Sequence, residues 1–126
     1  MSMRTPLAKA QGLGSAKSGT GHWWLQRVTA IANLPLVAAT VACLVYHLGA
    51  SRADVVASFQ NPFVALTFAL TFVSVLWHMR LGLQVVIEDY VHGPGARFAC
   101  LMLNTFFTAA LGFAALFAIL KMSLGA

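Results

Sequence analysis

The chain has 126 residues, of which 60% are hydrophobic and only 9% are charged. Soluble domains carry about 25% charged residues, and a domain this small buries only about two-thirds of its surface, so the composition excludes a soluble globular protein. The net charge of +5 does not indicate a nucleic-acid partner, because the basic residues flank long apolar segments. The sequence therefore predicts a membrane protein with one domain.

Residues 1–21 form a polar segment that contains several glycines and serines. This segment lacks the run of about 7–15 apolar residues that a cleavable signal peptide requires. We therefore expect the first apolar helix to remain as an uncleaved anchor. The distribution of basic residues along the chain places the polar segment in the cytoplasm.

Residues 22–126 contain three apolar blocks. Each block is long enough for a helix to cross a bilayer core, which takes about 20 residues. The blocks are continuous rather than alternating, which excludes the strands of a membrane β-barrel. We therefore predict an all-α membrane anchor whose three transmembrane helices cover approximately residues 24–48, 60–89 and 96–122.

Basic residues predict the orientation of these helices. Five of them precede the first apolar block or lie between the second and third: Arg4, Lys9, Lys17, Arg27 and Arg97. The opposite side has only Arg52 and Lys121. Because basic residues accumulate on the cytoplasmic side of membrane helices, we expect the N-terminus to lie in the cytoplasm or the mitochondrial matrix.

A histidine lies deep in the second predicted helix. His78 precedes Glu88 by ten residues, which places it about 15 Å deeper in the membrane, near the midplane. An ionisable residue at that depth indicates a functional site, and its less costly neutral form is also the form that binds iron. Helical periodicity places it on one face with five other residues, namely Thr71, Ser74, Gly82, Val85 and Asp89.

Small residues lie about one turn away on either side of this histidine, at Ser74 and Gly82. Small side chains allow another helix, or a flat macrocycle, to approach closely. The residues alone therefore leave two interpretations open. His78 either binds a haem iron or forms a hydrogen bond to a neighbouring helix in a close helix–helix contact.

A second polar ridge, formed by Arg80, Gln84 and Glu88, lies on roughly the opposite face of the same helix. Arg80 either extends toward the cytoplasmic headgroups or lies near an anionic group, such as a haem propionate or the carboxylate of a partner. Glu88 near the end of the helix can simply be solvated. These alternatives also remain open.

The chain by itself cannot complete a six-coordinate haem site with two histidines. Such a site needs two imidazoles at one depth on opposite faces of the ring. None of the remaining histidines, His22, His47 and His92, matches the depth of His78. We therefore expect the second ligand to come from another subunit.

The stretch HMRLGLQVVIEDYVHG at residues 78–93 resembles the second-helix signature of the small hydrophobic anchor subunit, the D-type subunit, of succinate dehydrogenase (respiratory complex II). The shared pattern is a histidine, a glycine four residues later, a glutamine, and an Asp-Tyr pair that ends twelve residues after the histidine. HWWLQRVTAI at residues 22–31 resembles the start of that family's first helix, including Arg27. The Ser-x-x-His-Arg stretch of the partner C-type anchor is absent, which favours the D-type assignment.

The resemblance implies a membrane-anchor subunit of succinate:ubiquinone oxidoreductase in the bacterial or mitochondrial inner membrane. Such a subunit tethers the flavoprotein and iron–sulfur subunits and shares a b-type haem with the C-type anchor. It also contributes to ubiquinone reduction, which links the tricarboxylic acid cycle to the respiratory chain. The chain itself has no flavin or iron–sulfur motif, so the dicarboxylate chemistry would belong to its partners.

The resemblance also implies roles for particular residues. His78 would be an axial ligand of the haem iron, Tyr90 would form a hydrogen bond to a carbonyl oxygen of ubiquinone, and Asp89 would support that site and its proton delivery. We expect four further residues in the surroundings of the haem or quinone, although no family role transfers to position 80: Arg27, Ser74, Arg80 and Gly82.

Each of these assignments has a structural alternative. Tyr90 would suit the aromatic belt at a membrane surface, and Asp89 would suit the end of a helix. The whole chain could be a purely structural anchor of a fumarate reductase or another membrane complex, without a haem. A transporter or channel subunit is a third possibility, which three helices with one deep polar stripe do not favour.

Overall fold

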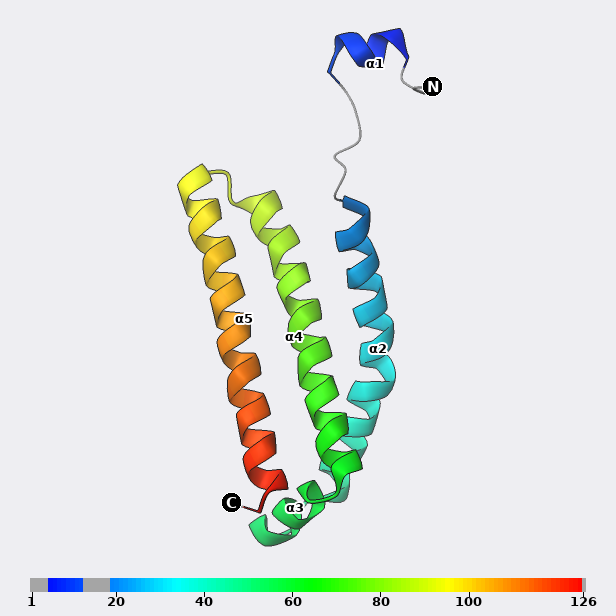
Figure 1. The fold of residues 1–126 in the computed structure, drawn as a ribbon, viewed down its shortest axis with the longest axis vertical. Coiled ribbons are helices and arrows are strands. Elements are labelled where there is room, and N and C mark those ends of the chain that lie inside the picture. The colour runs from blue at the N-terminus through cyan, green and yellow to red at the C-terminus, as the bar shows by residue number, and fades with distance from the viewer. Residues whose placement is uncertain (1–4, 13–18, 126) are drawn as a thin grey trace.

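The computed structural model describes residues 5–12 and 19–125. The described residues form helices and connecting turns only (Figure 1): α1 (Pro6–Ala10), α2 (Gly19–Tyr46), α3 (Arg52–Phe59), α4 (Pro62–Tyr90) and α5 (Pro94–Ser123). Helices α2, α4 and α5 are each long and apolar enough to cross a membrane. The predicted all-α class with three transmembrane helices is therefore confirmed.

Local sequence signals determine where α4 begins and ends. The Asn61 side chain accepts a hydrogen bond from the backbone N–H of Phe63 at 3.0 Å, and Pro62 occupies the first turn, where its missing N–H costs nothing. Pro94 likewise occupies the first turn of α5, whose N-cap Gly93 makes no side-chain hydrogen bond, and a proline disfavours helical backbone in the residue before it. The short turn between Tyr90 and Pro94 makes α4 and α5 antiparallel neighbours.

Helix α3 was not predicted from the sequence. The sequence indicated a loop without a helix between the first two transmembrane helices. The Ser51 hydroxyl accepts from the backbone N–H of Asp54, and the Asp54 carboxylate accepts from the backbone N–H of Ser51. This reciprocal pair satisfies donors that would otherwise be free at the start of the helix. Phe59 at the other end of α3 is buried against Phe68, with ring centroids 4.8 Å apart, so tertiary packing stabilises a helix of only eight residues.

Helix α2 begins at Gly19, five residues before the predicted start near residue 24. The prediction followed the apolar block, whereas the helix continues beyond it through polar and aromatic residues. Backbone hydrogen bonds do not require apolar side chains, so a membrane helix can extend into the interfacial region. This extension adds His22 and a further turn to α2.

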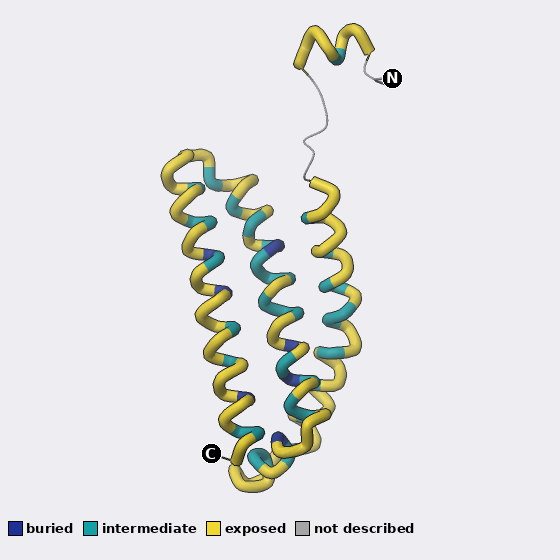
Figure 2. The backbone as a smooth tube through the Cα atoms, viewed as in Figure 1, coloured by how far each residue is buried: buried dark blue, intermediate teal, exposed yellow. Residues whose placement is uncertain are grey.

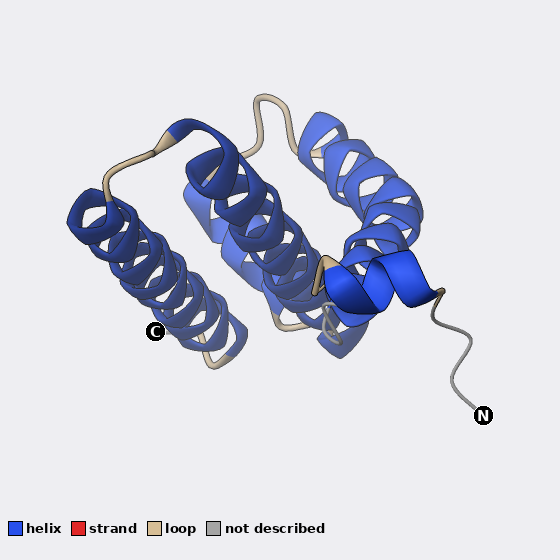
Figure 3. Ribbon diagram, turned by 90° about the horizontal axis from the view of Figure 1, so that it is seen from above, coloured by secondary structure: helices blue, strands red, loops and turns tan. Residues whose placement is uncertain are grey.

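Helix α4 is the centre of the bundle (Figures 1 and 3). It packs against α2 on one side and α5 on the other, and the backbones of these two outer helices do not come close to each other in the described part of the chain. A small core of Phe59, Phe68 and Ile119 closes the end of the bundle at α3. The opposite end has no covering helix among the described residues.

Most of the surface of the three long helices is exposed (Figure 2). Large apolar side chains such as Leu34 and Phe113 are 73% and 75% exposed. Exposed apolar surface on this scale marks contact with lipid or with other proteins. The fold therefore requires lipid or partner subunits around it.

Candidate functional site

The polar stripe of α4 faces α2. The hydroxyl oxygens of Thr71 and Thr40 are 2.9 Å apart, and the Ser74 hydroxyl donates to Oδ1 of Asn33 at 2.6 Å. The third member, His78, contacts α2 further along the same face. Helical periodicity predicted that these residues of α4 share a face, and the structure confirms it.

His78 is half-buried, and both of its ring nitrogens lie against side chains of α2. Its Nδ1 is 3.0 Å from the hydroxyl oxygen of Thr29, and its Nε2 is 3.4 Å from the amide nitrogen of Gln26. The second contact is at the long end of the hydrogen-bonding range. Of the two interpretations left open by the sequence, a haem ligand or a hydrogen bond to a neighbouring helix, the contacts within this single chain correspond to the second.

Gly82 lies one turn after His78, on the side where Gln26 approaches. A Cβ atom at position 82 would lie 3.6 Å from Nε2 of Gln26, which is an ordinary van der Waals contact. An alanine would therefore fit against α2. The chain's own packing does not explain the glycine, although glycine costs about 1 kcal/mol of helix stability relative to alanine.

The donor set of this chain limits which metal centres it can hold. The described residues contain no group of three or more His, Cys, Asp and Glu side chains that could hold a metal ion. His78 could therefore contribute one ligand to an iron whose other ligands come from elsewhere. A haem meets this condition, because its macrocycle supplies the equatorial donors and the protein only the axial ones.

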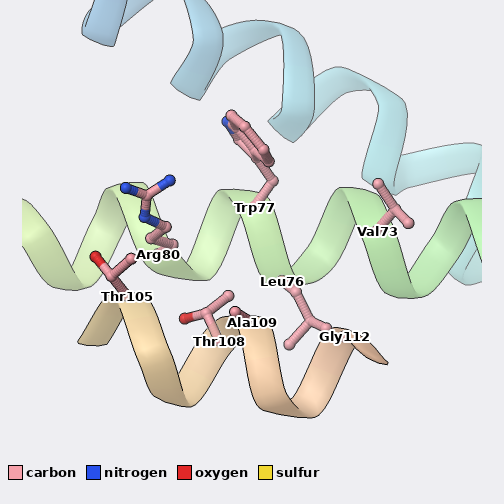
Figure 4. Close-up of a pocket in the computed structure, with 8 residues that line it drawn as sticks. All are labelled: Val73, Leu76, Trp77, Arg80, Thr105, Thr108, Ala109 and Gly112. Atoms are coloured by element: carbon pink, nitrogen blue, oxygen red, sulfur yellow. The ribbon is translucent and has the colours of Figure 1, made fainter. Parts of the chain in front are cut away.

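Arg80 is among the residues of α4 that border a pocket shared with α5, and its guanidinium extends away from the α5 residues on the Trp77 side (Figure 4). Its guanidinium carbon is 5.8 Å from the ring centroid of Trp77, and its backbone carbonyl accepts from Nδ2 of Asn104 on α5 at 3.0 Å. Eight residues line a cavity of about 210 Å³ between α4 and α5: Val73, Leu76, Trp77, Arg80, Thr105, Thr108, Ala109 and Gly112. The two polar stripes of α4 thus have different neighbours.

Asp89 and Tyr90 are exposed at the end of α4. The Tyr90 side chain is 77% exposed, while the neighbouring Glu88 carboxylate accepts from Nε2 of Gln84 at 2.8 Å. The first turns of α2 lie at the same end of the bundle (Figure 1). On α2, the Arg27 guanidinium is 5.4 Å from the ring centroid of Trp23. These groups are accessible to a partner or a ligand at this end.

Five polar residues of the site were not predicted from the sequence: Gln26, Thr29, Asn33, Thr40 and Asn104. The four on α2 are spaced at i, i+3, i+7 and i+14, which is the period of one helix face, so the signal was present. Asn104 is 7% exposed and its Oδ1 has no hydrogen-bond partner in the described structure. On α5, Thr108 lies four residues later on the same face, and its hydroxyl donates to the Asn104 carbonyl at 2.7 Å. One such pair is too short to establish a period, so the contact with α4 reveals the position of Asn104.

Comparison with known proteins identifies relatives along almost the whole chain. Residues 1–120 match the family described as succinate dehydrogenase/fumarate reductase transmembrane subunit. The succinate dehydrogenase hydrophobic membrane anchor subunit of Paracoccus denitrificans is 36% identical over 122 residues, which cover 97% of this chain and 94% of that protein.

Two further relatives are similar over a shorter span. The corresponding subunit of Rickettsia bellii is 38% identical over 91 residues, or 70% of each chain. The succinate dehydrogenase membrane anchor subunit of Reclinomonas americana is 36% identical over 90 residues, covering 69% of this chain and 75% of that protein. No solved structure matches the chain.

These matches confirm the predicted family, and together with the three apolar helices they confirm the predicted location in a bacterial or mitochondrial membrane. The matched span includes all of α2 and α4 and the part of α5 up to residue 120. The chain belongs to the family of succinate dehydrogenase/fumarate reductase transmembrane subunits, and the relatives to which it is similar are succinate dehydrogenase membrane anchors.

Proposed function

We propose that this chain anchors the flavoprotein and iron–sulfur subunits of a succinate:ubiquinone oxidoreductase to the membrane. It shares a b-type haem with a second, C-type anchor subunit and contributes to the ubiquinone site. One observation carries the proposal. A half-buried histidine lies at mid-length in α4, eleven and twelve residues before the two members of an exposed Asp-Tyr pair at the end of the same helix.

The haem assignment depends on His78. It is sixteen residues after Pro62 and twelve before Tyr90, so it lies about 24 Å and 18 Å from the two ends of α4. A b-type haem, when bound, supplies a one-electron carrier inside the membrane. The residues of this chain would hold it through a neutral imidazole at position 78, with Ser74 and Gly82 providing room for close approach.

A second protein ligand would come from the C-type subunit, because none of the other three histidines of this chain, all of them in its described part, lies near the middle of the bundle with His78. His47 is near the opposite end of α2, where its Nδ1 donates to the carbonyl oxygen of Cys43 at 2.7 Å. His22 lies in the first turns of α2, and His92 lies in the turn after α4. The exposed faces of α2 and α4 leave surface for the second subunit.

The quinone assignment depends on the exposed end of α4. The Tyr90 hydroxyl can donate a hydrogen bond to a quinone carbonyl oxygen, and the neighbouring Asp89 carboxylate can accept and pass on protons. A quinone has an apolar tail, which prefers the bilayer, and a polar head, which needs donors near the membrane surface. The end of a transmembrane helix meets both requirements.

A reduced-minus-oxidised optical spectrum of the purified complex tests the haem assignment. We expect a b-type spectrum in the wild-type complex and its loss in His78→Ala, while the flavin content of the complex stays unchanged. An unchanged b-type spectrum in His78→Ala would exclude this histidine as a ligand. Complete absence of a b-type spectrum from the wild type would favour the purely structural anchor, for which the contacts of His78 with α2 are the supporting observation.

Tyr90→Phe tests the quinone assignment separately. We expect the rate of ubiquinone reduction to fall about tenfold, corresponding to one lost hydrogen bond of about 1.4 kcal/mol. Oxidation of succinate by an artificial soluble acceptor should stay unchanged, since that reaction does not use the membrane site. An equal loss in both assays would indicate a defect in assembly rather than in quinone binding.

A further inference from the structure

The hydroxyl group of Thr29 has three polar neighbours. Its Oγ1 is 2.8 Å from the carbonyl oxygen of Leu25, 3.2 Å from that of Gln26, and 3.0 Å from Nδ1 of His78. A hydroxyl has a single hydrogen to donate, whereas its oxygen can also accept. The carbonyl oxygens can only accept, so they compete for that hydrogen.

The proton of this hydroxyl is directed to the carbonyl of Leu25, its shortest contact. Threonine commonly donates in this way to the carbonyl four residues earlier in a helix. The Thr29 oxygen is then left to accept a hydrogen bond, and the donor facing it is the N–H at Nδ1 of His78. In a neutral imidazole with its hydrogen on Nδ1, the lone pair lies on Nε2.

The contact at the other ring nitrogen agrees with this tautomer. The group that faces Nε2 of His78 is the amide nitrogen of Gln26, which donates and does not accept. The opposite tautomer requires two changes together: the Thr29 hydroxyl would have to turn away from Leu25, and the Gln26 amide would have to rotate.

The two contacts differ in strength. The Thr29 contact at 3.0 Å is the shorter, whereas the Gln26 amide is 3.4 Å from the ring. Its Oε1 is buried without a hydrogen-bond partner in the described structure. The amide at Nε2 is therefore the contact that a ligand can displace at lower cost.

We propose that Thr29 is a positioning residue for His78: it accepts the Nδ1–H bond and so directs the Nε2 lone pair to the haem iron, while Gln26 covers Nε2 only until the haem binds. This inference rests on the proposed haem site. It assigns to α2 the outer-sphere hydrogen bond that ligating histidines generally make through their second nitrogen, and the loss of such a bond typically lowers metal affinity by about 10–100-fold.

A matched pair of variants, Thr29→Val and Gln26→Met, tests this role in the intact complex. Each removes one polar contact of His78, the first at Nδ1 and the second at Nε2. The measurements are the rate of haem release to an excess of a haem-scavenging apoprotein and the midpoint potential of the retained haem. Thr29→Ser, which keeps the hydroxyl, is the conservative control.

We expect Thr29→Val to release haem about 10–100 times faster and to raise the midpoint potential, because the Nδ1 hydrogen bond makes the imidazole a stronger donor to ferric iron. Thr29→Ser should keep the haem-release rate and the midpoint potential of the wild type, and Gln26→Met should not accelerate haem release. A role of Thr29 in helix packing alone would leave the potential unchanged and would overturn the proposal. So would faster release in Gln26→Met with no change in Thr29→Val, because the iron would then be on Nδ1.

The His78→Ala complex separates this inference from the haem assignment on which it rests. If the wild type holds no b-type haem, or if His78→Ala holds it unchanged, the haem assignment itself is wrong. If His78 is required for the haem but Thr29→Val leaves haem release and potential unchanged, only the role of Thr29 is overturned.

Discussion

The two sides of α4 are held in different ways. Toward α2, Thr71, Ser74 and His78 each make a side-chain contact with a polar group of the neighbouring helix. Toward α5, the contact is largely apolar and borders a partly open pocket, and the Asn104 side chain of α5 donates to the Arg80 carbonyl of α4.

This difference has a physical meaning in a membrane. Lipid tails are as apolar as leucine, so apolar contact by itself gives little preference for one helix partner over lipid. Hydrogen bonds between helices, each contributing about 0.6 kcal/mol on average, fix the register of α2 against α4. The side with the polar contacts is therefore specified residue by residue, and it is also the side on which His78 lies.

The largest expected contrast between the two sides comes from the two ionisable residues at mid-length of α4. His78→Ala should abolish the b-type spectrum, whereas Arg80→Gln should retain it, because the Arg80 guanidinium lies over Trp77 and beside the α5 cavity. Optical spectra of the two complexes at equal flavin content provide the measurement. Loss of the haem in Arg80→Gln would instead support the alternative in which Arg80 neutralises a propionate.

Two glycine-to-alanine variants, one on the α2 side of α4 and one on α5, test which side a haem approaches. A Cβ at Gly82 would lie 3.6 Å from Gln26, and a Cβ at Gly112 would lie 3.6 Å from Leu76, so the chain itself has room for both. We expect Gly112→Ala to leave the haem spectrum unchanged and Gly82→Ala to shift it or lower haem content, because only position 82 faces the proposed haem side. Identical spectra for both variants would mean that no macrocycle approaches Gly82.

A smaller effect concerns the hydrogen bond between Asn33 and Ser74. A double-mutant cycle with Asn33→Ala and Ser74→Ala should give a coupling of about 1 kcal/mol, within the range measured for such bonds in membranes. The control cycle pairs Asn33→Ala with Thr108→Ala on the α5 side, and it should be additive within about 0.5 kcal/mol. Thermal unfolding of the purified complex, followed at equal detergent concentration, measures both. A coupling of Asn33 with Ser74 no larger than that of the control pair would show that this hydrogen bond does not stabilise the contact between α2 and α4.

The smallest effect lies outside the membrane, at the start of α3. Hydrogen bonds from the Ser51 side chain, and then from its backbone, lower the pKa of the Asp54 carboxyl from its usual value. A carboxyl whose pKa is lowered by folding stabilises the folded form above its unfolded pKa, and this contribution is lost as the pH falls through the folded pKa. We expect the first turn of α3 to fray below the ordinary aspartate range. Carbon-13 chemical shifts of residues 52–59 would report the fraying, and Asp54→Asn should remove its pH dependence.

The sequence by itself determined the class of the protein and its spans. Blocks of about 20 apolar residues can satisfy their backbone only as helices in lipid, so α2, α4 and α5 were predictable from hydropathy. The shared face of Thr71, Ser74 and His78 was also predictable, because a period of 3.6 residues depends only on the helix. Helix α3 was missed because its eight residues depend on a capping box and on Phe59 packing against Phe68, which hydropathy does not reveal.

Only the tertiary structure decided which neighbour each face of α4 meets. The sequence placed Arg80 opposite His78 but could not say that α5 lies on the Arg80 side and α2 on the His78 side, because helix order along the chain does not fix helix order in space. The same holds for Thr29 and Gln26, whose importance depends on which nitrogen of His78 each one contacts. Periodicity gives the direction of a side chain from its own helix axis, and packing alone determines what stands in that direction.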